Sequence, residues 1–174
     1  HYVDGIMIRT FKHSDVLDLA KYGTIPVING LTDLMHPCQI LSDLFTIYEK
    51  KGKLKGLKLA YIGDGNNVAN SLLQGCAITG MDISVASPRG YECDGTITEQ
   101  ARHAAKKSGS KVLLTEDPEE AIRDADVVYT DTWISMGQEA EKELRLKVFT
   151  PYRVNKKLFS LAKEDAMFLH CLPA

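Results

Sequence analysis

Short apolar runs alternate with longer segments of helical periodicity along most of this sequence, and that alternation constrains the fold more than any other feature. From residue 57 onward, strands are expected at 57–62, 83–86, 112–114, 127–130 and 167–170. Helices are expected between them at 67–79, 98–107, 118–124, 139–148 and 155–162. Short apolar strands separated by helices are typical of a parallel sheet. We therefore expect an α/β fold, a parallel sheet with helices on both faces.

The first part of the chain carries two further strand signals, at 3–8 and 25–28. A helix is expected between them at 14–21, with Ser14 as its N-cap. Pro37 then opens a longer helix. Apolar residues at helical spacing predict one buried face for that helix, made of Ile40, Leu41, Leu44, Ile47 and Tyr48.

The first thirty or so residues are too few to form a hydrophobic core of their own. We expect residues 1–35 to be the C-terminal part of a preceding domain, 36–52 a connecting helix, and 53–174 a second domain. The chain opens without methionine close to a strand and ends directly after another. A domain rarely begins and ends so abruptly, so we expect a central fragment of a longer protein, with the end of the second domain missing.

Composition excludes several classes of function. The formal charge is −2, with 21 basic and 23 acidic residues and no basic run, which argues against nucleic acid as a partner. No apolar stretch approaches the ~20 residues needed to cross a bilayer, so no membrane partner is expected. The four cysteines are widely spaced, which predicts reduced thiols in a reducing compartment and no metal site.

The turn Gly63-Asp64-Gly65-Asn66-Asn67 follows an expected strand and resembles part of a dinucleotide fingerprint. The third glycine of that fingerprint is replaced by Val68. The next strand ends in Ser87-Pro88-Arg89, with no carboxylate to bind a ribose. A nicotinamide-dependent oxidoreductase is therefore the lesser alternative, and Asn66 and Asn67 could simply cap the following helix.

His36-Pro37-Cys38-Gln39 stands at a helix start, where free N–H groups and the helix dipole suit an anion or a polarised carbonyl. The same position disfavours imidazolium, so a neutral His36 could donate a hydrogen bond to a carbonyl oxygen. Gln39 could fix the amide end of that ligand, and Arg9, at a strand end, could bind a phosphate. A capping or surface histidine and a solvated arginine are the simpler alternatives.

Two further turns carry polar groups at strand ends, the edge of a parallel sheet where ligands bind. Asp131 could hold a cationic ammonium with help from Ser135, although Asp131 could also cap a turn and Met136 could belong to the core. Cys171 has nothing nearby in sequence to lower its pKa, so an inert buried thiol is its simpler interpretation.

Taken together, these motifs resemble the ornithine carbamoyltransferase family, and the resemblance runs along the whole chain in unbroken order. The matching segments are His36-Pro37-Cys38-Gln39, Asp64-Gly65-Asn66-Asn67, Asp131-Thr132-Trp133-Ile134-Ser135-Met136-Gly137 and His170-Cys171-Leu172-Pro173. The resemblance implies one domain for carbamoyl phosphate, a Rossmann-like domain for ornithine, and assembly into homotrimers or multiples of trimers.

The resemblance also implies roles for single residues. Carbamoyl phosphate would be bound by Arg9, His36, Pro37, Cys38, Gln39, Cys171 and Leu172. Ornithine would be bound by Asn67, Asp131, Ser135 and Met136. The residues implied in catalysis are Arg9, His36, Asp131 and Cys171.

The implied reaction transfers the carbamoyl group of carbamoyl phosphate to the δ-amine of L-ornithine, giving L-citrulline and phosphate for arginine metabolism, without metal or organic cofactor. The family's Ser-Thr-Arg-Thr phosphate loop and a C-terminal arginine are absent from these 174 residues, so the chain alone is expected to be inactive. Transcarbamylases acting on putrescine, acetylornithine or aspartate are close alternatives, against which the Ser135-Met136-Gly137 segment argues. A cytoplasmic location is expected, with the mitochondrial matrix left open.

Overall fold

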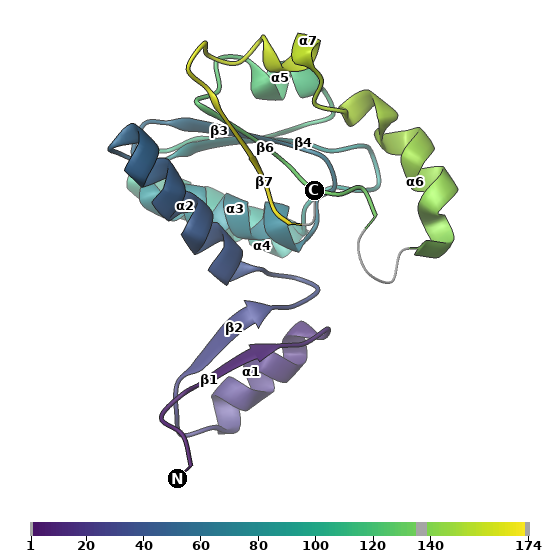
Figure 1. The fold of residues 1–174 in the computed structure, drawn as a ribbon. Coiled ribbons are helices and arrows are strands. Elements are labelled where there is room, and N and C mark those ends of the chain that lie inside the picture. The colour runs from purple at the N-terminus through teal and green to yellow at the C-terminus, as the bar shows by residue number, and fades with distance from the viewer. Residues whose placement is uncertain (1, 135–138, 173–174) are drawn as a thin grey trace.

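The computed structural model describes residues 2–134 and 139–172, which form two parallel sheets (Figure 1). The smaller sheet pairs β1 (Ile6–Arg9) with β2 (Val27–Leu31), and α1 (His13–Tyr22) connects the two strands. The larger sheet has five strands in the order β5-β4-β3-β6-β7. The expected α/β architecture is confirmed.

The five strands of the larger sheet run parallel. Their bounds are β3 Lys58–Ile62, β4 Asp82–Ala86, β5 Val112–Thr115, β6 Val127–Thr130 and β7 Met167–His170. The chain adds β4 and β5 on one side of β3, then crosses back to add β6 and β7 on the other. This reversal creates a topological switch point at the carboxyl ends of β3 and β6, where ligands bind in open parallel sheets.

Helices cover both faces of the large sheet (Figure 1). One face packs against α2 (Pro37–Lys51), α3 (Asn67–Thr79) and α4 (Gly95–Ser108). The other packs against α5 (Pro118–Ile122), α6 (Lys142–Phe149) and α7 (Lys156–Phe159), with short 3-10 turns at Glu139–Glu141 and Thr150–Tyr152. Each face has its own apolar core, as expected for strands that are buried on both sides.

The chain between β2 and α2 joins the two sheets. Side chains of α3 hold this joining segment in place by hydrogen bonds to its backbone groups. Asn67 Nδ2 donates to the carbonyl oxygen of Thr32 at 2.6 Å, and Asn70 Nδ2 donates to that of Leu34 at 3.2 Å. Ser71 Oγ accepts from the backbone N–H of His36 at 2.7 Å. The start of α2 is therefore fixed against the start of α3.

Some of the expected elements are wrong in detail. Ser14 is not a cap, because α1 already begins at His13 and Lys12 precedes it without a side-chain hydrogen bond. The second strand begins at Val27 rather than residue 25, and Pro26 just before it has no N–H to donate to a ladder. The 139–148 and 155–162 helices are shorter than expected, the first because its opening turn is a 3-10 helix.

The expected buried face of α2 is also only partly right. Ile40, Leu44 and Ile47 are buried, but Leu41 and Tyr48 are 68% and 54% exposed. The inner face of this helix is narrower than the apolar pattern suggested. No helix among the described residues is both long and apolar enough to span a membrane.

Candidate functional site

The candidate site lies at the switch point, where the turns after β3 and β6 meet. Asn66, in the turn after β3, caps α3 by accepting from the backbone N–H groups of Val68 and Ala69 at 3.0 and 3.1 Å. Its amide Nδ2 donates to Asp131 Oδ2 at 2.7 Å, just after β6. The alternative in which an asparagine of this turn caps the helix is thus realised by Asn66, which also orients an acidic side chain.

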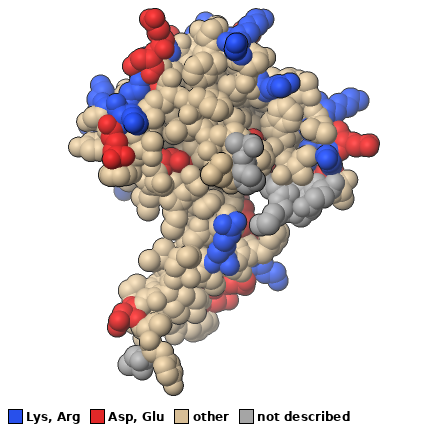
Figure 2. Space-filling model, in the orientation of Figure 1, with Lys and Arg blue, Asp and Glu red and all other residues tan. Residues whose placement is uncertain are grey.

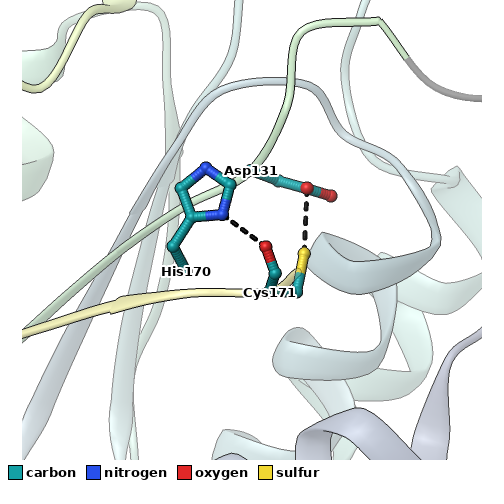
Figure 3. A group of neighbouring side chains, drawn as sticks. All are labelled: Asp131, His170 and Cys171. Carbon is teal, nitrogen blue, oxygen red and sulfur yellow. Dashed lines mark hydrogen bonds between the residues drawn. The ribbon is translucent and has the colours of Figure 1, made fainter. Parts of the chain in front are cut away.

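The other oxygen of Asp131 is held equally firmly. Asp131 Oδ1 accepts from the backbone N–H of Thr132 at 2.6 Å and from the thiol of Cys171 at 2.9 Å. Figure 3 shows the thiol directed at this carboxylate from the end of β7. Hydrogen bonds to both oxygens fix the carboxylate before any ligand arrives.

Cys171 is a neutral thiol in this setting. Burial and the hydrogen bond to Asp131 raise its pKa to about 12, so it is a hydrogen-bond donor and a poor nucleophile. The raised pKa agrees with the inert buried thiol that was the simpler interpretation of the sequence. Leu172, one residue further on, is 87% exposed.

Asp131, His170 and Cys171 offer ligand atoms that all lie within 4.8 Å of one another, the kind of arrangement that can hold a cation. The ring of His170 is turned back towards its own chain, with Nδ1 2.5 Å from the carbonyl oxygen of Cys171 (Figure 3). A metal ion would have to displace the thiol proton that Asp131 accepts, because the thiolate is the metal ligand.

His36 stands at the N-terminus of α2 and faces the same site. Its pKa is lowered, first by burial and then by the nearby charge of Arg9, while a hydrogen bond with the Gly30 backbone and the charge of Asp131 act in the opposite direction. The expected neutral imidazole is thus favoured, with burial as the main cause. Its buried Nδ1 has no hydrogen-bond partner among the described residues.

The remaining residues of the expected carbamoyl phosphate group differ in their surroundings. Arg9 is exposed at the end of β1. Gln39 is half-buried and donates from Nε2 to Asp43 Oδ1 at 3.0 Å. Cys38 is exposed and its thiol donates to the carbonyl oxygen of Asn29 at 3.3 Å, away from Asp131 and Cys171. Pro37 occupies the first turn of α2.

In the expected ornithine group, Asn67 is the first residue of α3, and Asp131 directly follows β6. Asn67 Nδ2 is engaged by the Thr32 carbonyl. Ser135 and Met136 lie outside the described residues. The structure thus gathers Asp131, Cys171 and His36 at one edge of the sheet, with Asn67 beside them.

Arg145 was not anticipated from the sequence. It is 2% exposed, pairs with the carboxylate of Asp64, and donates from Nε to the carbonyl oxygen of Trp133 at 2.6 Å. Its guanidinium lies over the rings of Tyr91 and Phe149, 4.9 and 5.1 Å from their centroids. It ties the turn after β3 to the segment after β6, and a lone arginine in a charged helix gave no signal of that role.

Asp43 was missed as well, although its position carried a signal. It is the one charged residue among the inner-face positions 40, 43, 44 and 47 of α2, and it is buried.

A cavity of about 460 Å³ opens beside the site, on the face of the sheet that α5, α6 and α7 cover. Its walls include Asp131, Trp133, Leu146 and His170.

Comparison with known proteins identifies the family. Residues 55–174 match the domain family described as "Aspartate/ornithine carbamoyltransferase, Asp/Orn binding domain", and residues 1–49 match "Aspartate/ornithine carbamoyltransferase, carbamoyl-P binding domain". The chain is 64% identical over 173 residues to an ornithine carbamoyltransferase of Bacillus subtilis (strain 168), and 62% identical over 173 residues to one of Anoxybacillus flavithermus. These alignments cover 99% of this chain and 54% and 55% of the relatives. The chain therefore spans about half the length of the curated relatives it matches.

Solved structures agree with this assignment. Ornithine carbamoyltransferase from Pyrococcus furiosus superposes with a TM-score of 0.95 at 57% identity, covering 99% of this chain and 55% of that one. The ornithine transcarbamoylase of Giardia lamblia does so with a TM-score of 0.90 at 31% identity, covering 99% and 59%. With family matches over both of its sheets, the chain belongs to the aspartate/ornithine carbamoyltransferase family.

Proposed function

We propose that the full-length protein containing this chain transfers the carbamoyl group of carbamoyl phosphate to the δ-amine of L-ornithine, giving L-citrulline and phosphate. The observation that carries the proposal is the hydrogen-bonded group Asn66, Asp131 and Cys171 at the switch point. His36 lies within electrostatic reach of this group and has a free buried nitrogen. A carboxylate for an amine and a neutral donor for a carbonyl oxygen are the two groups that carbamoyl transfer requires.

The carbamoyl phosphate half of the proposed site is built on the start of α2 and the end of β1. Arg9 supplies a positive charge for the phosphate, and His36 donates to the carbamoyl oxygen. Gln39 contacts the carbamoyl amide end, with the backbone at Pro37, Cys38, Cys171 and Leu172 lining the same region. The lowered pKa of His36 supports its role as a neutral donor.

The ornithine half is built on the turns after β3 and β6. Asp131 orients the amine, because both of its oxygens are already fixed by donors from the protein. Cys171 assists as a neutral thiol, in keeping with its raised pKa. Asn67 keeps Oδ1 for the ligand, since its Nδ2 binds the Thr32 carbonyl. Ser135 and Met136 complete the set in the proposal.

In this mechanism the neutral δ-amine attacks the carbamoyl carbon and a carbon–nitrogen bond forms. The tetrahedral oxyanion is stabilised by His36 and Arg9, which is usually the largest single contribution to catalysis of this kind. The bond from carbon to the phosphate oxygen then breaks, and the departing phosphate takes the proton that the nitrogen loses. Holding both substrates at one sheet edge supplies the proximity contribution. No covalent enzyme intermediate is needed.

We propose the domain organisation on the same basis. Residues 1–35 belong to the carbamoyl phosphate domain, 36–52 form the connecting helix, and 53–174 belong to the ornithine domain. We propose a full-length homotrimer or a multiple of trimers from the family resemblance alone. Relatives include bacterial enzymes and a mitochondrial one from Coccidioides immitis, and we propose the cytoplasm for this protein.

The test is a citrulline assay on the full-length protein, with L-ornithine compared against putrescine, acetylornithine and aspartate as acceptors. We expect L-ornithine to give the highest kcat/KM by a wide margin. A preference for putrescine, acetylornithine or aspartate would reassign the acceptor while keeping the family. The Ser135-Met136-Gly137 sequence favours ornithine in the resemblance. Tight binding of a nicotinamide nucleotide would instead revive the oxidoreductase alternative.

A further inference from the structure

Asp43 is a buried carboxylate that the proposed mechanism leaves unused. It lies on the inner face of α2, one turn after Gln39, and is only 9% exposed. Its two oxygens accept hydrogen bonds from neutral groups, Gln39 Nε2 at 3.0 Å and the Tyr129 hydroxyl at 2.9 Å. A buried acid is costly to keep unless such partners hold it, so its presence here calls for a reason beyond helix packing.

The contact with Gln39 decides which way the amide of that residue is turned. An amide has nitrogen donors on one side and an oxygen acceptor on the other, and the two orientations have almost the same shape. A carboxylate can only accept, so Gln39 must turn Nε2 towards Asp43. The atom left to meet a ligand is therefore Oε1. The pKa of Asp43 is raised overall by burial, and the hydrogen bonds from Tyr129 and Gln39 offset part of that rise by favouring the ionised form.

The contact with Tyr129 fixes Asp43 relative to the rest of the site. Tyr129 is fully buried in β6, two residues before Asp131, and its ring stacks on Tyr61 with centroids 6.0 Å apart. The Tyr61 hydroxyl in turn lies 3.4 Å from Asn66 Oδ1. Asp43 thus contacts the strand that carries Asp131 through Oδ2, while Oδ1 accepts separately from Gln39.

We propose that Asp43 is a positioning residue that selects a carbamoyl group over an acyl group lacking an N–H, by holding Gln39 with Oε1 towards the carbamoyl nitrogen. The inference rests on the proposed function, in which Gln39 contacts carbamoyl phosphate. A carbamoyl NH₂ donates to Oε1, whereas the methyl group of acetyl phosphate cannot. Without Asp43 the Gln39 amide is free to flip, and its Nε2 then faces the carbamoyl NH₂, so that two hydrogen-bond donors meet.

The experiment uses the full-length enzyme and the variant Asp43→Leu, which keeps a similar side-chain shape without an acceptor. The KM for carbamoyl phosphate is measured alongside the inhibition constant of acetyl phosphate as a competitor. We expect the KM to rise about tenfold, the effect of losing one hydrogen bond, while the inhibition constant of acetyl phosphate stays within about twofold. Asp43→Asn, which still offers an oxygen to Gln39, is expected to restore most of the loss.

Tyr129→Phe is the matched control, since it removes the other hydrogen bond to Asp43 and leaves the one to Gln39. We expect it to keep the ratio of the two constants near that of the wild-type enzyme. Should Asp43→Leu not fold, Asp43→Ser provides the same comparison, because its smaller side chain leaves space for water beside the Tyr129 hydroxyl.

Equal weakening of carbamoyl phosphate and acetyl phosphate would overturn the inference and leave Asp43 a structural residue. The inference would also be overturned if Asp43→Leu and Asp43→Ser left the ratio of the KM for carbamoyl phosphate to the inhibition constant of acetyl phosphate unchanged. Failure of the proposed function has a different signature, because a wild-type enzyme that forms no citrulline overturns that function before any variant is made. An active wild-type enzyme with an unaltered ratio in the variants sinks only the role of Asp43.

Discussion

At the scale of single residues, Asp131 brings the turns after three strands together. Asn66 reaches it from the turn after β3, Cys171 reaches it from the end of β7, and Thr132 donates from the next peptide. The position of this carboxylate is thereby decided by the sheet and by side chains that are distant in sequence. A ligand that binds this carboxylate therefore loses little further side-chain entropy in fixing it.

Asp131→Asn in the full-length enzyme should impair ornithine binding far more than carbamoyl phosphate binding. Ornithine keeps a cationic α-ammonium when its δ-amine is neutral, and losing a charge-assisted contact between that ammonium and the carboxylate should cost about 1.5–3 kcal/mol. Isothermal titration with each substrate measures the two effects separately. Asp165→Asn is the control, because that carboxylate, in the turn before β7, is 77% exposed and pairs with Lys51 at the end of α2. Equal losses for both substrates would argue against the proposed role of Asp131.

His36→Ala should lower kcat and kcat/KM together, by roughly 10²–10³, because its hydrogen bond strengthens as charge develops on the oxygen. His103→Ala, at an exposed position on α4, serves as the control and should leave both constants near wild type. Steady-state kinetics on the full-length enzyme provides the measurement. A change confined to KM would show that His36 binds only the ground state.

The acid side of the pH profile gives a second test of His36. Burial and Arg9 lower its pKa below the usual value of about 6.5, so the neutral form persists as the pH falls through 6.5. Imidazolium forms only below the lowered pKa, and activity is lost there. We expect kcat for the full-length enzyme at saturating substrates to hold at pH 6.5 and fall at lower pH. In His36→Ala that acid limb should disappear.

At the scale of elements, the turn between β3 and α3 depends on a close backbone approach. A Cβ at Gly65 would lie 2.2 Å from the carbonyl carbon of Glu92 and 2.3 Å from the nitrogen of Cys93, both backbone atoms that cannot move aside easily. Gly65→Ala should therefore lower the free energy of unfolding by about 1–3 kcal/mol and weaken ornithine binding by displacing Asn66. Gly95, with nothing within 4 Å, provides the control substitution to alanine. Denaturant unfolding of both full-length variants distinguishes the two, and equal stability would contradict the close approach.

Sequence patterns identified most of the large sheet, since apolar strands and glycine-ended helices carry local signals. The strand at 127–130 and the helix at 67–79 were predicted to the residue. The patterns failed where tertiary contacts decide. Leu41 and Tyr48 have the right spacing for a core face, but nothing described packs over them.

The candidate site was predictable in part for the same reason. Strand ends could be located, so Asp131 and Cys171 could be placed at one edge. Arg145 could not be placed there, because its partner Asp64 lies 81 residues away in the sequence. Contacts of this kind depend on how α6 packs on the sheet, which no local pattern encodes.

At the scale of the whole molecule, the 174-residue chain on its own should have no appreciable transferase activity. The resemblance assigns phosphate binding to an upstream loop, and Arg9 is the one phosphate ligand that the proposal finds among residues 1–35. Apolar side chains near the start of the chain are 51–67% exposed, namely Val3, Met7 and Phe11. Figure 2 shows acidic and basic side chains mixed over the face of the molecule in view. Ile6 and Ile8, on the same strand as Met7, are half-buried.

The measurement is citrulline formation by the purified chain at saturating substrates, with light scattering as a second readout. We expect turnover below one-hundredth of the full-length enzyme, together with self-association through the exposed apolar residues. Turnover near that of the full-length enzyme would contradict the account of the phosphate site. A monodisperse solution would contradict the account of the exposed surface.

The segment that joins the two sheets has an uneven tolerance to change. Asn67 and Asn70 bind the carbonyl oxygens of Thr32 and Leu34, and Ser71 binds the N–H of His36 and, more weakly, the sulfur of Met35. Those backbone groups are the same whatever side chain the joint carries at position 34. Position 34 should therefore tolerate a change of side chain better than Asn67, Asn70 or Ser71, each of which holds the joint by a hydrogen bond. Position 32 differs from position 34, because the buried Thr32 hydroxyl itself accepts from the backbone N–H of Met35 at 3.1 Å and lies 3.0 Å from His13 Nδ1.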